Sequence, residues 1–250
     1  MQVTKRNHLY QLAFMPKFFP VNCYLVEEED SLTLIDAALP FCAADILKAV
    51  ENIGKPLKRV LLTHVHSDHI GALDKLKAAL PELEVWVPAR EERLMRGDRS
   101  LDPGESPKPI KGGLPEKLKT KADFFMNDGD KIGSLSASET PGHTPGSMSF
   151  LDTRDDSLIA GDAFQTRGRA AVAGQLVITF PFPAMATWCK DTALLSAEKI
   201  KSHNPSLLAV GHGRMLENPA AHIEKAIQYA KRALQEGRDF DVTKNGTYKR

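Results

Sequence analysis

One stretch of this sequence restricts the possible folds more than any other: residues 58–80, KRVLLTHVHSDHIGALDKLKAAL. It begins with a short apolar run that is typical of a buried strand, and it ends with apolar residues at helical spacing. Between the two stand four side chains that can bind a cation: His64, His66, Asp68 and His69. A solvated polar turn and a satisfied cluster in the core are the alternatives. However, crowded imidazoles repel one another when protonated, and burial without a partner is costly; a bound cation removes both objections. The stretch therefore predicts a metal site at the end of a strand.

The segments around the cluster alternate between strand and helix patterns. Apolar runs at 24–26 and 32–35 predict paired strands, and the stretch FCAADILKAVENIG at 41–54 has helical spacing closed by Gly54. The run EVWVP at 84–88 predicts another strand, and the second half adds strand patterns that end in turns and helices over 186–202 and 219–235. This alternation favours a layered α/β fold with ligand-type residues at the carboxyl ends of strands. The whole chain, 1–250, is expected to form a single domain with a frayed polar tail at 238–250.

Residues 96–123 form an unusually long connection. They contain four prolines and four glycines with mixed charge, and they are too long for an ordinary connector. A solvated surface loop and a lid over a substrate are both compatible with this composition.

Charge and hydropathy exclude some classes of partner. The net charge is +1, from 33 basic and 32 acidic residues, so the sequence offers no electrostatic surface for nucleic acid. No run of apolar residues is long enough to span a membrane, and the first residues do not resemble a secretion signal. We expect a cytoplasmic protein that acts on a small molecule; the sequence does not indicate its oligomeric state.

Further metal ligands are expected downstream, because six residues cannot close a metal site alone. Three candidates follow apparent strands: His143 in ETPGHTPGS, Asp162 in LIAGDAF and His212 in LAVGHGR. Each has glycine nearby, which permits tight turns beside an ion. His8, His203 and His222 are assigned to the surface.

The motifs THVHSDHIGAL, TPGHTPGS, AGDA and GHG, in this order, resemble the metallo-β-lactamase-fold hydrolase superfamily from about Asn22 to about Gly213. The resemblance implies a four-layer αβ/βα sandwich with two metal ions in a cleft at one edge of the sheets. It implies that the first ion is held by His64, His66 and His143, and the second by Asp68, His69 and His212. Asp162 would bridge both ions, and Asp36 would support the site from behind the ligands.

The expected chemistry is metal-assisted hydrolysis. Two divalent ions can share a bridging hydroxide that attacks a carbonyl or phosphoryl centre, and Asp68 could hold the proton of this nucleophile. We expect zinc, although iron and manganese suit the same ligands. The resemblance, together with the positions at which this sequence differs from known members, favours a hydrolase of an ester, lactone or thioester. It argues against a secreted class B β-lactamase, because Asp162 stands where many of those enzymes carry cysteine. The standard lactonases of this superfamily carry a tyrosine where this chain has Gln165. Phosphodiester or phosphotriester cleavage, and a non-catalytic metal-stabilised binding protein, remain alternatives.

An apolar insertion follows Asp162, and it has two interpretations. Phe180, Phe182, Met185 and Trp188 could pack between a strand and the next helix, or they could form one wall of a substrate pocket beside the metals. In the second case Gln165 and Arg167 would also line the pocket, and Arg167 or Arg169 could bind a carboxylate of the substrate.

Overall fold

Two β-sheets face each other in the computed structural model, which describes residues 1–236. The first sheet has seven strands in sequential order. They are β1 (Gln2–Arg6), β2 (Leu9–Phe14), β3 (Val21–Glu27), β4 (Leu32–Ile35), β5 (Leu57–Leu61), β6 (Glu84–Pro88) and β7 (Phe124–Met126). Neighbouring strands are antiparallel from β1 to β4 and parallel from β4 to β7.

The second sheet has six strands in the order β15-β14-β11-β10-β9-β8. They are β8 (Lys131–Ile132), β9 (Leu135–Glu139), β10 (Met148–Asp152), β11 (Ser157–Ile159), β14 (Leu207–Ala209) and β15 (Leu216–Glu217). Only the β11–β14 pair is parallel. A separate two-stranded ribbon joins β12 (Phe164–Gln165) to β13 (Ala171–Val172).

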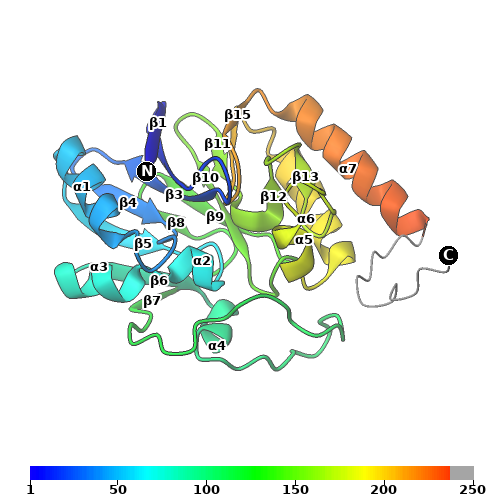
Figure 1. Cartoon of the computed structure of the whole chain (residues 1–250), viewed down its shortest axis with the longest axis horizontal. Coiled ribbons are helices and arrows are strands. Elements are labelled where there is room, and N and C mark those ends of the chain that lie inside the picture. Colours follow the sequence, from blue (N-terminus) through cyan, green and yellow to red (C-terminus); the bar gives the residue numbers. More distant parts are fainter. Residues whose placement is uncertain (237–250) are drawn as a thin grey trace.

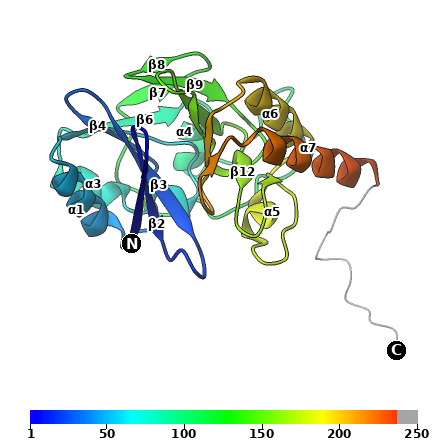
Figure 2. The ribbon, with the colours of Figure 1, turned by 90° about the horizontal axis from the view of Figure 1, so that it is seen from above.

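Four helices cover the outer faces of the two sheets: α1 (Ala43–Ile53), α3 (Leu73–Ala79), α6 (Lys190–Ser202) and α7 (Ala220–Gln235). The loops add the short helices α2 (Ser67–Ile70), α4 (Glu91–Met95) and α5 (Phe182–Ala186), and a 3-10 turn at Gly161–Ala163. Helices α1 and α3 lie on one side of the molecule and α6 and α7 on the other, with both sheets between them (Figures 1 and 2). This arrangement confirms the predicted αβ/βα sandwich.

The strand residues explain why there are four layers. In β3, Cys23 and Leu25 belong to the core beneath the first set of helices, whereas Tyr24 and Val26 belong to the core between the sheets. Neighbouring residues of a strand point to opposite faces, so a strand that is apolar at every position can fill two cores at once. In the second sheet, Leu158 packs toward α6 and α7, and its neighbour Ile159 packs between the sheets.

Two predicted helices are interrupted, and in both cases the chain turns to contact another loop. The helix expected after the histidine cluster is split between α2 and α3, where the amide of Gly71 donates to the carbonyl of Ala38 and not to its own helix. The helix expected from residue 186 begins at Lys190 instead. The amides of Trp188 and Cys189 donate to the carbonyls of His143 and Gly142, which holds this stretch out of the helix.

At the N-terminus, strands β1 and β2 form a hairpin that the sequence analysis did not predict. Residues 96–123 contain no helix or strand, and the predicted frayed tail at 238–250 lies outside the described residues. Within residues 1–236, none of the helices is both long and apolar enough to cross a bilayer.

Candidate metal centre

The predicted ligand residues come together although they are spread over 149 positions of the chain, from 64 to 212. His64 to His69 follow β5, His143 lies in the turn between β9 and β10, Asp162 follows β11, and His212 follows β14. Each turn begins where a strand ends at the same edge of the sandwich. This is the edge at which layered α/β folds commonly place their sites.

Three groups of side chains lie close enough to hold a cation. They are His64 with His66 and His143, His64 with His69 and Asp162, and Asp68 with His69 and His212, and within each group the ligand atoms lie within 4.8 Å of one another. All of these residues are buried except Asp68, whose side chain is 28% exposed. Asp68 therefore lies on the solvent side of the cluster.

Asp162 lies between the first and third groups. Its Oδ2 is 3.3 Å from Nε2 of His143 and 3.2 Å from Nε2 of His212, and its Oδ1 is 3.4 Å from Nε2 of His69. One carboxylate thus faces histidines of both groups, which is the position that a bridging ligand requires.

The three histidines of the first group each have one ring nitrogen bound outside the cluster. His64 Nδ1 lies 3.0 Å from the Thr63 hydroxyl, and His143 Nδ1 lies 3.1 Å from the Thr187 hydroxyl. His66 Nε2 lies 3.0 Å from the carbonyl of Lys111. An outer hydrogen bond of this kind fixes the ring and its tautomer, so that the other nitrogen is presented to a metal.

The two histidines of the third group follow the same rule. His69 Nδ1 is 2.8 Å from Oδ2 of Asp36, and His212 Nδ1 is 2.6 Å from the carbonyl of Pro20. Asp36 also accepts hydrogen bonds from the amide and hydroxyl of Thr63, so it orients His69 directly and His64 through Thr63. It adopts a left-handed conformation with φ of +59°, which aspartate tolerates better than most residues.

The donor set fits a transition-metal ion. Nε2 of His64 is buried and has no hydrogen-bond partner among residues 1–236, which is costly unless a cation binds it. Nδ1 of His66 and Nε2 of His143 are 3.0 Å apart. Two nitrogens on a tetrahedral zinc ion would be about 3.3 Å apart, so these atoms need to move little to share one.

Burial and charge divide the histidines into two kinds. Burial holds the pKa of His64, His66 and His143 below the ordinary value, to about 3 for His143, so these rings are neutral and can bind a metal. Burial also acts on His69 and His212, but the carboxylates of Asp162 and Asp68 outweigh it and raise the pKa of both rings. Those carboxylates attract positive charge, which a bound cation would supply.

The long segment 96–123 is attached to the first group of ligands. The carbonyl of Lys111 contacts His66, and the carbonyl of Gly113 accepts hydrogen bonds from the amide and hydroxyl of Ser67. Arg99 donates to the carbonyls of Ile110 and Gly112, which flank Lys111. This part of the segment is therefore a fixed strap that touches a predicted metal ligand; whether other parts act as a lid remains a prediction.

A buried acid joins the two loops of the first group. Oε2 of Glu91 accepts from the amide of Val65, which stands between His64 and His66, and Oε1 accepts from the amide of Gly146. Burial raises the pKa of Glu91 to about 7, despite these hydrogen bonds. Glu91 thereby fixes the HxH loop relative to the loop of His143.

The aromatic residues of the insertion are divided between wall and core. The ring of Phe180 lies 5.2 Å from that of His212 and is fully buried, and Phe182 lies 5.3 Å from Phe180 and is 50% exposed. Phe19, from the loop between β2 and β3, contacts both phenylalanines at 5.1 and 4.8 Å. The three rings form an apolar wall beside His212, to which Phe19 is an addition that we did not predict.

The other predicted pocket residues have different surroundings. Trp188 is buried in the core and donates to the carbonyl of Lys108, so it packs under the strap, and Met185 is 56% exposed. Gln165 is buried and donates to the carbonyl of Phe180 at 3.4 Å. Arg167 donates to the carbonyl of Lys17, which ties the insertion to the loop that carries Phe19. Arg169 lies over the ring of Tyr229 on α7 instead.

Several supporting residues were not predicted. Thr63 opens the THVHSDHIGAL motif, but its hydroxyl was not assigned a role, whereas Pro20, Lys111 and Glu91 act through backbone carbonyls and a distant carboxylate that form no motif. Of the histidines assigned to the surface, His8 and His222 are exposed, whereas His203 is half-buried.

Comparisons with known proteins agree with this geometry. A family model described as the metallo-beta-lactamase superfamily matches residues 16–212. "Uncharacterized protein YobT" of Bacillus subtilis (strain 168) is 53% identical over 232 residues, which cover 93% of this chain and 100% of that protein. "Probable metallo-hydrolase YflN" of the same organism is 31% identical, with 77% and 80% covered. A "Hydroxyacylglutathione hydrolase" of Enterobacter sp. (strain 638) is 30% identical, with 58% and 47% covered.

Solved structures show the same fold at low sequence identity. The DIM-1 metallo-beta-lactamase exposed to ceftazidime superimposes with a TM-score of 0.69 at 14% identity, covering 93% of this chain and 97% of that one. TTHA1623 in a di-iron-bound form superimposes with a TM-score of 0.61 at 22% identity, covering 84% and 95%.

Proposed function

The chain belongs to the metallo-beta-lactamase superfamily, and from this premise we propose that it is a dinuclear metal-dependent hydrolase of an ester, lactone or thioester. One observation carries the proposal. Five histidines each present one ring nitrogen to a common centre while the other nitrogen is held by a partner outside it. A cluster that served only to stabilise the fold would not need this division.

The ligands divide into two sets that share a carboxylate. His64, His66 and His143 form the first set, and Asp68, His69 and His212 form the second. The distances from Asp162 to His143, His69 and His212 support a bridging role. We assign zinc to both positions; iron and manganese suit the same donors, and the similar TTHA1623 was solved in a di-iron-bound form.

When bound, two divalent cations lower the pKa of water to about 7 and stabilise negative charge that develops on the substrate. The chain contributes orientation and proton transfer. Asp68 is the ligand-type residue on the solvent side, and its Oδ2 lies 3.4 Å from His212 Nε2. Its carboxylate is placed to receive a proton from the nucleophile and to pass it to the leaving group.

The apolar wall supports a substrate with an uncharged acyl arm. Phe19, Phe180 and Phe182 stack edge to face beside His212, and the exposed side of Phe182 is available for contact. A relative of this chain is named hydroxyacylglutathione hydrolase, and acylglutathiones are thioesters. The near-neutral charge of the chain gives no long-range attraction for polyanions, so neutral acyl substrates are favoured over phosphodiesters.

A panel of substrates tests the proposal. The full chain, loaded with zinc, iron or manganese, is assayed on aryl esters, lactones, acyl thioesters and a phosphodiester, with chelator-treated protein as the control. We expect metal-dependent turnover of at least one carbonyl substrate and a slower rate on the phosphodiester. A faster phosphodiester rate would shift the substrate class to phosphoryl esters. Metal binding without turnover of any substrate would favour a binding protein.

A further inference from the structure

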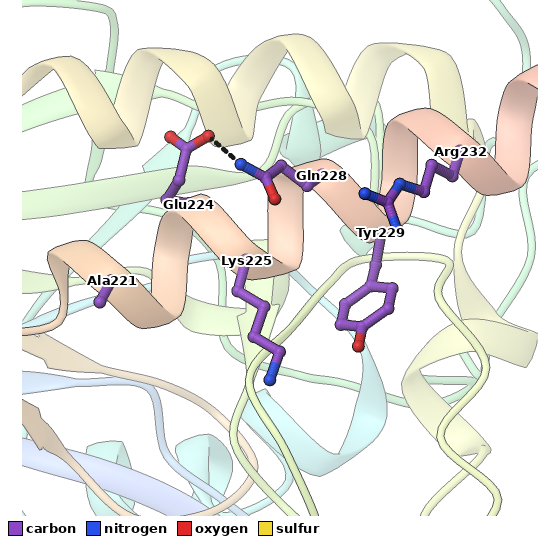
Figure 3. Close-up of a pocket in the computed structure, with 6 residues that line it drawn as sticks. All are labelled: Ala221, Glu224, Lys225, Gln228, Tyr229 and Arg232. Atoms are coloured by element: carbon purple, nitrogen blue, oxygen red, sulfur yellow. Dashed lines mark hydrogen bonds between the residues drawn. The ribbon is translucent and has the colours of Figure 1, made fainter.

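A second cavity lies outside the metal cluster, between the insertion and α7. Its volume is about 310 Å³, and its lining includes Thr166, Arg169, Arg214, His222, Lys225 and Tyr229. None of the residues that line it belongs to the predicted metal ligands. A neighbouring hollow along the outer face of α7 shares Lys225 and Tyr229 with it (Figure 3).

The lining carries three permanent positive charges. Arg169, Arg214 and Lys225 line the cavity, and in the described part of the chain, residues 1–236, no aspartate or glutamate does. Within residues 1–236, none of the three forms an ion pair with a carboxylate. Arg169 instead donates to the carbonyls of Ala170 and Leu176. Like charges around one cavity repel one another, and an anion between them would remove that repulsion.

The nearby acids are engaged elsewhere. Glu224 precedes Lys225 on α7, but Figure 3 shows its side chain on the other side of the helix from Lys225, where it accepts a hydrogen bond from Gln228. The Glu224 carboxylate also pairs with Lys201. Glu217, three residues after Arg214, pairs with Arg6. Among residues 1–236, the positive lining therefore has no neutralising side chain from either neighbouring element.

One aromatic ring organises the cations. The guanidinium of Arg169 lies 5.2 Å from the centre of the Tyr229 ring, and Nζ of Lys225 lies 6.0 Å from it. Cation–π contacts of this kind hold the two side chains near the ring without neutralising them. In Figure 3, Lys225 and Tyr229 project from the same side of α7. The ring also offers an apolar surface to the organic part of a ligand.

We propose that this cavity binds the phosphate group of a small phosphate monoester. Two arginines and a lysine suit a phosphate monoester better than a single carboxylate, because the phosphate carries close to two negative charges and three acceptor oxygens, whereas a carboxylate carries one charge and two oxygens. The volume is at the lower end of small-molecule pockets, which accommodates a phosphate with a modest organic group. The proposal does not depend on the chemistry at the metal centre.

The cavity adjoins the metal-centre loop through the backbone. The amide of Thr166 donates to the carbonyl of His212, and its hydroxyl donates to the carbonyl of Arg214. A metal centre can also bind phosphate, so the experiment must separate the two places. Substitutions in the cavity do this, because phosphate held at the metals would be unaffected by them.

Calorimetric titration of the full metal-replete chain, at constant low ionic strength, tests the proposal with phenyl phosphate, inorganic phosphate and benzoate as probes. The variants are Arg214→Ala/Lys225→Ala and, as the matched control, Lys199→Ala/Lys231→Ala. The control removes the same charge from the surface of α6 and α7, where the two lysines pair with Asp128 and Glu198 and the Glu224–Lys201 pair is left intact. Lys225→Glu is the second cavity variant, and thermal unfolding verifies that each variant is folded.

We expect phenyl phosphate to bind the natural chain more tightly than benzoate. The cavity variants should lose at least tenfold in affinity, and the control should change less than twofold. Three results would overturn the proposal: no binding of phenyl phosphate up to about 10 mM, equal binding by the cavity variants, or an equal loss in the control. Benzoate binding as tight as phenyl phosphate would overturn the assignment to phosphate.

Discussion

Gly112→Ala should detach the strap from the first set of metal ligands. A Cβ on Gly112 would lie 2.1 Å from Nε2 of His66 and 2.5 Å from its Cε1, whereas ordinary contacts begin near 3.4 Å. The backbone at Gly112 is also left-handed, with φ of +85°, which costs alanine about 1–2 kcal/mol. Either the imidazole or the strap must therefore move by more than 1 Å, and the hydrogen bond from His66 to the Lys111 carbonyl is lost.

The expected loss is in metal affinity at the first set. Removing a partner that orients a ligating histidine typically weakens metal binding by about 10- to 100-fold. Chelator competition monitored at equilibrium measures this change, and elemental analysis after dialysis gives the number of ions that remain. We expect one of the two ions to be lost at chelator concentrations at which the natural chain keeps both.

Gly113→Ala is the matched control. A Cβ there would meet only the Ser67 hydroxyl, at 3.6 Å, and the residue has no left-handed backbone. This variant should keep the affinity of the natural chain. Unchanged metal affinity in Gly112→Ala, or an equal loss in Gly113→Ala, would refute the role assigned to the strap.

Three further predictions concern the ligands, a buried acid and the apolar wall. The metal-replete chain should hold two ions by mass spectrometry, and Asp162→Ala should weaken both because it removes the shared carboxylate; a stoichiometry of one under saturating metal would contradict two sites. Burial raises the pKa of Glu91 from 4.5 to about 7 in the folded chain, so the folded state favours the protonated acid, and the free energy of unfolding should fall as pH rises from about 4.5 to about 7. Glu91→Gln does not ionise, so chemical denaturation should show this variant gaining a few kcal/mol of stability relative to the natural chain over the same range. A stability difference between the two chains that does not change with pH would exclude a raised pKa. Phe182→Ala should reduce kcat/KM more for long-chain than for short-chain acyl substrates, and the difference should grow by several-fold per added methylene, at about 0.8 kcal/mol each. Because the ring of Phe180 is fully buried, Phe180→Ala should lower the free energy of unfolding instead. An equal loss of kcat/KM on all substrates from Phe182→Ala would assign the Phe182 ring to packing.

The layered fold, and the His and Asp residues that gather at one edge of it, could be predicted because they leave local signals. Apolar strands that end in His and Asp residues next to glycine can be recognised one segment at a time. The prediction of α/β layers needed only the alternation of two periodicities. The predicted start of the helix at residue 186 was wrong, because the amides of this stretch donate hydrogen bonds to carbonyls of a distant loop.

The environment of the ligands could not be predicted, because it depends on contacts between segments far apart in sequence. Glu91 reaches Val65 and Gly146, and the Lys111 carbonyl reaches His66 across 45 positions. The pocket residues show the same limit. Phe180 and Trp188 are both aromatic and lie only eight positions apart in the sequence. However, Phe180 lies beside His212, whereas Trp188 packs in the core.

The spread of the ligands along the chain also sets the time at which metal can be captured during synthesis. The first predicted set needs His143 and the second needs His212, so a growing chain carries only His64 to His69 until residue 143 is made, and it completes both sets only at residue 212. These four residues cannot close a site by themselves, because each set draws on both sheets. On the proposed assignment, each metal site is complete only after strands of both sheets have come together, and Asp68, with a side chain that is 28% exposed, is the predicted ligand that faces solvent. Metal occupancy in the cell would therefore follow the supply of ions available after folding, and a chain matured under metal starvation could be filled later without unfolding.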